Sequence, residues 1–220
     1  MKYLALEPKD ELYCFAQVTV RSVIEWLLKA EVAGLHHIPQ TGGFLVACNH
    51  LSFLDPPAIG ALISRPISYF ARDTLFKPGF VDWLLRSLNS IPVKRDADSD
   101  ITAMKRTLNL LKKEEEGLLF FPEGTRSLDG KLQEAQPGIG LIACKTGVPV
   151  VPARIYGMDK ALGKHQKRLD LSTPVSIRFG PPLLPLDYDP GPKVEDRYKE
   201  SADRIMAAIA DLEPVLPPCV

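Results

Sequence analysis

A histidine and an aspartate lie five positions apart in the segment Asn49-His50-Leu51-Ser52-Phe53-Leu54-Asp55. A neutral imidazole accepts a proton from an alcohol, and a carboxylate bonded to its other nitrogen fixes the tautomer that does so. On one continuous helix, residues five apart differ in direction by about 140° and face away from each other. The pairing therefore requires His50 to lie in a turn before a helix, and the apolar run ending at Cys48 predicts a strand before that turn.

The same residues also fit a purely structural interpretation. Ser52 and Asp55 have the spacing of a helix-capping box, and His50 would then be an ordinary packed histidine. Alternatively, Asp55 is itself an N-cap, because Pro56 follows it and proline suits the first helical position. From these residues alone, both the proton-transfer pair and the helix cap remain open.

A second segment with chemical potential follows a short apolar run and reads Phe120-Phe121-Pro122-Glu123-Gly124-Thr125-Arg126-Ser127. Pro122 ends the run, Gly124 frees the backbone for a turn, and Arg126 projects from that turn beside two hydroxyl side chains. Arginine makes planar bidentate hydrogen bonds to phosphate, and exposed turn amides assist it. The segment favours a phosphate site, although such a turn also occurs without any function.

Together, these segments resemble the NHxSxxD and FPEGTRS blocks of the 1-acyl-glycerol-3-phosphate acyltransferase family. The resemblance extends over residues 32–182 and includes two further blocks, Ile91-Pro92-Val93-Lys94-Arg95 and Val148-Pro149-Val150-Val151-Pro152. It implies an O-acyltransferase of phospholipid biosynthesis that moves a fatty acyl group from a thioester to the free hydroxyl of lysophosphatidate, giving phosphatidate. Glycerol 3-phosphate or another lysolipid is the alternative acceptor.

The resemblance also implies roles for individual residues. His50 would be the general base, and Asp55 would orient it. The acceptor pocket would be formed by Glu123, Gly124, Thr125 and Arg126, with further positive charge for the phosphate from Arg95 and Arg72. This chain departs from the usual pattern at three positions: the family usually has glycine at Asn89, an acidic or amide residue at Lys94 and lysine at Arg72.

The resemblance further implies two substrates and no cofactor. The donor would be acyl-CoA or an acyl carrier protein, and the acceptor a lysophospholipid. We expect a cytoplasmic protein, peripheral on the cytoplasmic face of the membrane, because no stretch approaches the roughly 18 to 20 apolar residues that cross a bilayer and no signal peptide is recognisable. The N-terminal helix and the cations between Arg154 and Arg168 are the candidate docking surfaces, and a solvated face is the alternative interpretation of those cations.

Three rival interpretations use the same residues. In a hydrolase, Ser52 would be the nucleophile, but it lacks a Gly-x-Ser-x-Gly elbow and lies two residues from its supposed base. Cys48 as an acyl-accepting thiol is also disfavoured, because a cysteine inside an apolar strand is usually core. The third rival is a module that binds anionic lipid without turning it over.

Helix and strand patterns alternate along the chain. Apolar runs predict strands at residues 43–48, 67–71, 91–93, 118–121, 148–155 and 175–179. Helical spacing predicts helices at residues 57–64, 79–88, 101–113 and 138–146, with another near the C-terminus. Such alternation predicts an α/β fold in which helices flank a largely parallel central sheet, with functional loops where the strands end.

Residues 11–29 predict an amphipathic N-terminal helix with one narrow polar stripe, in which Gln17, Arg21, Glu25 and Lys29 recur at every fourth position. Its wide apolar face requires a cover, either the rest of the domain or lipid. We expect one acyltransferase domain over residues 1–220: this helix within 1–31, a catalytic α/β core over 32–182, and a proline-rich connector with a C-terminal helix over 183–220.

Composition supports a folded chain and excludes several classes of protein. Of 220 residues, 45% are hydrophobic and 25% charged, as in globular domains. The 27 basic and 27 acidic residues cancel, so no global field favours nucleic acid. The 4 cysteines lie far apart, which favours reduced thiols over disulfides and predicts no metal site.

Overall fold

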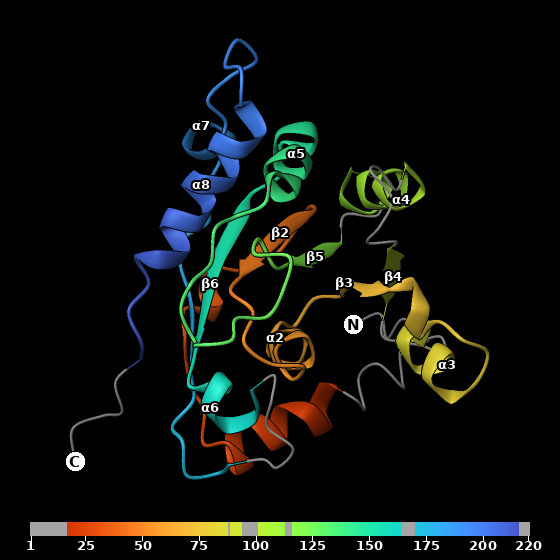
Figure 1. Ribbon diagram of the computed structural model, residues 1–220, viewed down its shortest axis with the longest axis vertical. Helices are drawn as coiled ribbons and strands as arrows, with labels where there is room; N and C mark the ends of the chain where they lie inside the picture. Colours follow the sequence, from red (N-terminus) through yellow and green to blue (C-terminus); the bar gives the residue numbers. More distant parts are fainter. Residues whose placement is uncertain (1–16, 88, 94–100, 113–115, 164–169, 216–220) are drawn as a thin grey trace, which may run out of the picture.

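A seven-stranded sheet forms the centre of the computed structural model, which describes residues 17–87, 89–93, 101–112, 116–163 and 170–215 (Figure 1). The strands are β1 (Glu31–Ala33), β2 (Phe44–Cys48), β3 (Ile67–Arg72), β4 (Ser90–Val93), β5 (Gly117–Phe120), β6 (Val150–Tyr156) and β7 (Ser176–Phe179). Their order is β1-β7-β6-β2-β5-β3-β4. From β6 to β4 neighbouring strands are parallel, and only the β6–β7 pair is antiparallel, which confirms the predicted largely parallel sheet.

Helices connect most of these strands. They are α2 (Asp55–Leu62), α3 (Phe80–Ser87), α4 (Ile101–Lys112), α5 (Pro137–Thr146), α6 (Met158–Leu162), α7 (Pro185–Tyr188) and α8 (Arg197–Ala210), with the shorter η1 (Val23–Leu27), η2 (Leu35–His37) and η3 (Asp73–Leu75). The sequence patterns missed β1, α6 and α7, which are 3 to 5 residues long. The division into three segments stays a prediction.

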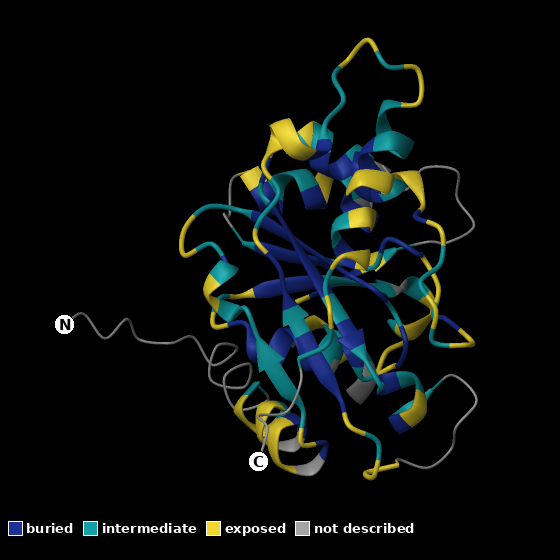
Figure 2. Cartoon of the chain, turned by 90° about the vertical axis from the view of Figure 1, so that its left-hand side faces the viewer, coloured by how far each residue is buried: buried dark blue, intermediate teal, exposed yellow. Residues whose placement is uncertain are grey.

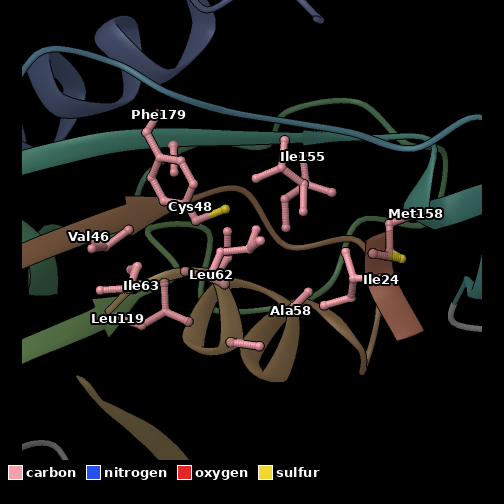
Figure 3. Close-up of a cluster of buried hydrophobic side chains, with 14 of the residues drawn as sticks. Ile24, Val46, Cys48, Ala58, Leu62, Ile63, Leu119, Ile155, Met158 and Phe179 are labelled. Atoms are coloured by element: carbon pink, nitrogen blue, oxygen red, sulfur yellow. The ribbon is translucent and has the colours of Figure 1, made fainter. Parts of the chain in front are cut away.

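Strand β2 is covered on both faces of the sheet. All five of its residues are buried, because parallel strands with helices on both faces bury every side chain. Val46 and Cys48 face one cluster, which also holds residues of α2, Ile24 of η1 and Met158 of α6 (Figure 3). Leu45 and Ala47 face the opposite cluster, which includes residues of α4, α5, α7 and α8.

Helices α5 and α8 pack side by side over the second cluster (Figure 1). A Cβ atom at Gly140 of α5 would lie 1.9 Å from the carbonyl oxygen of Tyr198 in α8, so only glycine permits this approach. Figure 2 shows the consequence in burial: the strands are buried at the centre, while the helices expose their outward residues. The buried side chains therefore hold the strands in place, and the loops that follow the strands lie at the edge of the sheet.

The N-terminal helix, which is described over residues 17–27 and includes η1, packs against the domain through some of its side chains. Its described part begins at residue 17, so residues 11–16 of the predicted helix lie outside the described residues. Ile24 and Leu28 are buried in the first cluster, and the Gln17 side chain donates to the carbonyl oxygen of Gly60 in α2 over 3.3 Å. Val18 and Trp26, however, are 65% and 85% exposed. The domain covers part of the apolar face and leaves part of it uncovered.

The departure at Asn89 has a backbone explanation. Asn89 has a φ of 57°, in the left-handed region that glycine adopts without strain. Asparagine is one of the few other residues that tolerate this region. The asparagine therefore preserves the turn that leads from α3 into β4.

Candidate active site

His50 and Asp55 lie in contact at the carboxyl end of β2. Nδ1 of His50 is 2.9 Å from Oδ2 of Asp55, and the carboxylate is fully buried. His50 precedes α2, whereas Asp55 is the first residue of that helix, so the intervening turn brings the two side chains together. An ionised carboxylate only accepts hydrogen bonds, so Nδ1 donates and Nε2 is left as the acceptor nitrogen.

The same carboxylate oxygen also organises the turn. Oδ2 of Asp55 accepts hydrogen bonds from the backbone amides of Leu51, over 2.6 Å, and Ser52, over 2.7 Å. The Ser52 hydroxyl accepts the amide of Leu54 in return. The N-cap of α2 is Leu54, not Asp55. No side-chain hydrogen bond caps α2, so neither helix cap that the sequence allowed is present; the carboxylate of Asp55 instead binds the imidazole and closes the turn before the helix.

Asn49 fastens this turn to the sheet. Its side-chain amide donates to the carbonyl oxygen of Ile155 over 2.9 Å and accepts the amide of Ile155 over 2.8 Å. The side chain is buried and continues the β2–β6 pairing one residue beyond the end of β2. This role of Asn49 was not predicted from the sequence, although a polar residue directly after a buried strand was the available signal.

Glu123 joins the second loop, residues 121–136 between β5 and α5, to the first loop, residues 49–54 between β2 and α2. One carboxylate oxygen accepts the backbone amide of His50 over 2.9 Å, and the other accepts the amide of Gln133 over 3.2 Å. Burial raises the pKa of Glu123 to about 7, and the two backbone hydrogen bonds only partly oppose this rise. The side chain is 3% exposed, so it holds the loops together from within instead of projecting into an open pocket.

Aromatic rings connect the two loops as well. The imidazole of His50 stacks on Phe121, with ring centroids 4.1 Å apart and planes inclined by 19°. The guanidinium of Arg126 lies over the ring of Phe53, 3.5 Å from its centroid. Neither phenylalanine was singled out by the sequence analysis, because the register between two distant segments is not visible in the residues themselves.

The other residues predicted to bind phosphate lie in different parts of the structure. Gly124 has a φ of 67° and forms the turn, where Thr125 is exposed beside Arg126. Arg72 is the last residue of β3, two strands from β2, and its side chain lies outside what the structure describes. Arg95 lies outside the described residues, which end at Val93 in this segment and resume at Ile101.

An apolar cavity of about 360 Å³ opens beside His50. It lies between the carboxyl-terminal parts of the strands and helices α4 and α5. Its walls are His50, Pro56, Phe70, Ala71, Val93, Met104, Thr107, Leu119, Phe120, Phe121, Pro122, Gly124, Gln136, Gly138 and Ile142. Because most of these side chains are apolar, the cavity suits a hydrocarbon chain.

The environments of Ser52 and Cys48 do not favour the rival nucleophiles. The Ser52 hydroxyl is buried and donates to the carbonyl oxygen of Leu162. Cys48 is fully buried, and burial raises the pKa of its thiol well above the ordinary value, which disfavours the reactive thiolate. The imidazole of His50 is paired with Asp55 and not with either of these groups.

Two further searches cover the described residues only. In that part of the chain, no group of three or more His, Cys, Asp and Glu side chains could hold a metal ion. None of the helices described there combines the length and apolar character that crossing a bilayer requires.

Comparison with known proteins gives consistent matches. A family model described as Acyltransferase matches residues 29–156. The chloroplastic 1-acyl-sn-glycerol-3-phosphate acyltransferase BAT2 of Brassica napus is 38% identical over 61% of this chain, which spans only 39% of that relative's length. The 1-acyl-sn-glycerol-3-phosphate acyltransferase of Bacillus subtilis is 26% identical over 92% of this chain and 97% of its own. The crystal structure of the 1-acyl-sn-glycerophosphate acyltransferase PlsC from Thermotoga maritima has a TM-score of 0.71 and 27% identity, covering 90% of this chain and 78% of its own.

Proposed function

Because this chain belongs to the acyltransferase family, we propose that it transfers a fatty acyl group from a thioester to the free hydroxyl of lysophosphatidate, giving phosphatidate. The printed names of the Brassica and Bacillus relatives support this acceptor. The observation that carries the proposal is the contact of 2.9 Å between His50 and Asp55 at the wall of an apolar cavity.

His50 is the general base in this reaction. Nε2 takes the proton of the acceptor hydroxyl while the hydroxyl oxygen attacks the thioester carbonyl carbon. Collapse of the tetrahedral intermediate leaves the new ester and breaks the carbon–sulfur bond, and the imidazolium returns its proton to the departing thiolate. Asp55 keeps Nδ1 protonated and stabilises the imidazolium. No acyl-enzyme forms.

Positioning contributes more than proton transfer to this mechanism. A general base accelerates such a step by roughly 10² to 10⁴, whereas holding both reactants in register removes about 7 to 11 kcal/mol from the barrier. Arg126 binds the acceptor phosphate, with the Thr125 hydroxyl and the turn amides beside it. Arg95 and Arg72 add positive charge, and Glu123 acts through the backbone of the two loops.

The acyl chain of the donor occupies the apolar cavity beside His50. Each buried methylene contributes about 0.8 kcal/mol, so a cavity of fixed depth discriminates between chain lengths. Phe70, Met104 and Ile142 supply apolar wall, and Gly138 leaves room on α5. A chain bound there brings its thioester carbonyl toward His50, which lines the same cavity.

The donor is acyl-CoA or an acyl carrier protein, and no cofactor is needed because the thioester already carries an activated acyl group. The protein acts at a membrane surface, peripheral on the cytoplasmic face, where the acceptor resides. The exposed Val18 and Trp26 support contact of the first helix with lipid. Of the basic segment at residues 154–168, Lys160 is exposed on α6, and residues 164–168 lie outside the described residues.

An assay of thiol release by the purified full chain tests the proposal. Acyl-CoA and acyl carrier protein thioesters are supplied in turn with lysophosphatidate, glycerol 3-phosphate or lysophosphatidylcholine. We expect turnover with lysophosphatidate, loss of turnover in His50→Ala, and turnover that persists in Cys48→Ala and in Ser52→Ala, although Ser52→Ala also removes the hydrogen bonds of its hydroxyl to Leu54 and Leu162. Binding of lysophosphatidate without thiol release, or equal turnover by His50→Ala, contradicts the proposed enzyme.

A further inference from the structure

Each of the two loops supplies one aromatic ring that stacks on a side chain of the other loop. The second loop supplies Phe121 to stack on His50, and the first loop supplies Phe53 to stack on Arg126. Phe53 is 71% exposed, so its ring does not contribute to the core. Its defined contact is the guanidinium, whose carbon lies 3.5 Å from the ring centroid.

Arg126 is held by this ring in place of a carboxylate. Within the described part of the chain, Arg126 forms no ion pair, and its buried Nη1 has no hydrogen-bond partner. Arg197, by contrast, is bound by the carboxylate of Asp189. An aromatic ring stacks on the flat face of a guanidinium and does not occupy its in-plane N–H donors, although Nη1 itself is buried here. The contact therefore orients the cation without neutralising it.

We propose that Phe53 is a positioning residue that presents Arg126 to the phosphate of the acceptor. This inference rests on the proposed function and deepens it. The residue acts through Arg126 and touches no reacting atom. Phe53 lies in the turn between His50 and Asp55, so its contact with Arg126 also joins that turn to the loop that carries the cation.

The magnitude follows from the ordinary strength of the contact. Cation–π interactions correspond to about a two- to thirtyfold change in an equilibrium constant, with the larger values at desolvated sites. We therefore expect Phe53→Leu to raise KM for the acceptor by that factor, with smaller changes in kcat and in KM for the donor. Phe53→Tyr keeps an aromatic face and should retain the wild-type KM.

The experiment uses a short-chain lysophosphatidate that is monomeric in water, so that insertion of Phe53 into lipid does not contribute. The constants kcat and KM are measured for wild type, Phe53→Leu, Phe53→Tyr, Arg126→Ala and the double variant Phe53→Leu/Arg126→Ala. Leu186→Ala removes a side chain that is 93% exposed on α7 and serves as the control. Once Arg126 is absent, the loss of Phe53 should have no further effect.

Three results would overturn the inference: an unchanged acceptor KM in Phe53→Leu, an equal loss in Phe53→Tyr, or an undiminished effect in the Arg126→Ala background. A loss seen only with acceptor in vesicles would likewise overturn it and assign Phe53 to the membrane. Calorimetric binding of the same lysophosphatidate separates the two proposals. If wild type binds it without turnover and Phe53→Leu binds it more weakly, the proposed function fails and the role of Phe53 stands.

Discussion

The carboxylate of Glu123, in the loop between β5 and α5, accepts the backbone amide of His50, in the turn between β2 and α2, over 2.9 Å. The amide of Ser127 donates in the opposite direction, to the carbonyl oxygen of His50, over 2.8 Å. Both backbone groups of His50 are thus bound by the second loop. The imidazole is fixed by its neighbours in space as well as by its own turn.

Replacing Glu123 by glutamine should loosen this junction. The glutamine oxygen accepts one of the two amides, but its NH₂ group cannot accept the other, so one buried donor loses its partner at a cost of about 1 to 3 kcal/mol. We expect lower kcat and a lower free energy of unfolding in urea. Glu195→Gln, at an exposed glutamate, is the matched control and should change neither.

The same group should give stability a specific pH dependence. Burial raises the pKa of Glu123 from 4.5 to about 7, so between these values the folded protein binds more protons at this group than the unfolded chain. Its contribution to stability is therefore present below about pH 4.5 and is lost as pH rises through about 7. The stability of wild type relative to Glu123→Gln should decline across that window. If the difference in free energy of unfolding between wild type and Glu123→Gln stays constant across this pH window, the pKa of Glu123 is not raised.

Asp55→Asn should reduce kcat by about 10² to 10⁴ under saturating substrates, because an amide in place of the carboxylate no longer fixes the His50 tautomer. KM for the acyl donor should change little. Asp203→Asn, on the exposed side of α8, controls for the loss of one negative charge. Activity within twofold of wild type in Asp55→Asn would refute the proton-transfer pair.

Acyl-chain preference should follow the cavity walls. A Cβ at Gly138 would lie 3.5 Å from the Phe120 ring, so a small side chain fits there and a larger one fills cavity space. We expect Gly138→Leu to favour shorter thioesters and Met104→Ala to favour longer ones. A two-methylene difference corresponds to about 1.6 kcal/mol, over tenfold in kcat/KM. Competition between thioesters of different lengths measures the shift, and an unchanged ranking in both variants removes this cavity as the chain site.

Asn49→Ala should destabilise the fold as well as the site. It leaves both the amide and the carbonyl of Ile155 without their side-chain partner, at a cost of about 2 to 5 kcal/mol. The urea midpoint should fall while the slope stays constant. Gln40→Ala, which removes one hydrogen bond from an exposed side chain to Ile38, should shift the midpoint far less. A comparable shift of the urea midpoint in both variants would mean that the hydrogen bonds of Asn49 to Ile155 stabilise the fold no more than the exposed bond of Gln40.

The sequence predicted the longer elements of the fold because their signals are local. Residues 43–48 were predicted as a strand, and β2 spans Phe44–Cys48. Residues 101–113 were predicted as a helix, and α4 spans Ile101–Lys112. The short β1, α6 and α7 were missed because so few residues carry no measurable period, and their structure depends on what they pack against.

The His50–Asp55 contact could be proposed from the sequence for a similar reason, since both residues lie within one six-residue segment, although a helix cap remained the alternative there. The burial of Glu123, the anchoring of Asn49 and the stacking of Phe53 on Arg126 were decided by the tertiary structure alone. These contacts require β2 to lie between β5 and β6, so that loops about 70 or more residues apart in sequence meet at one edge of the sheet. The covering of both sheet faces by helices constrains that order, and it is a property of the whole chain and not of any segment.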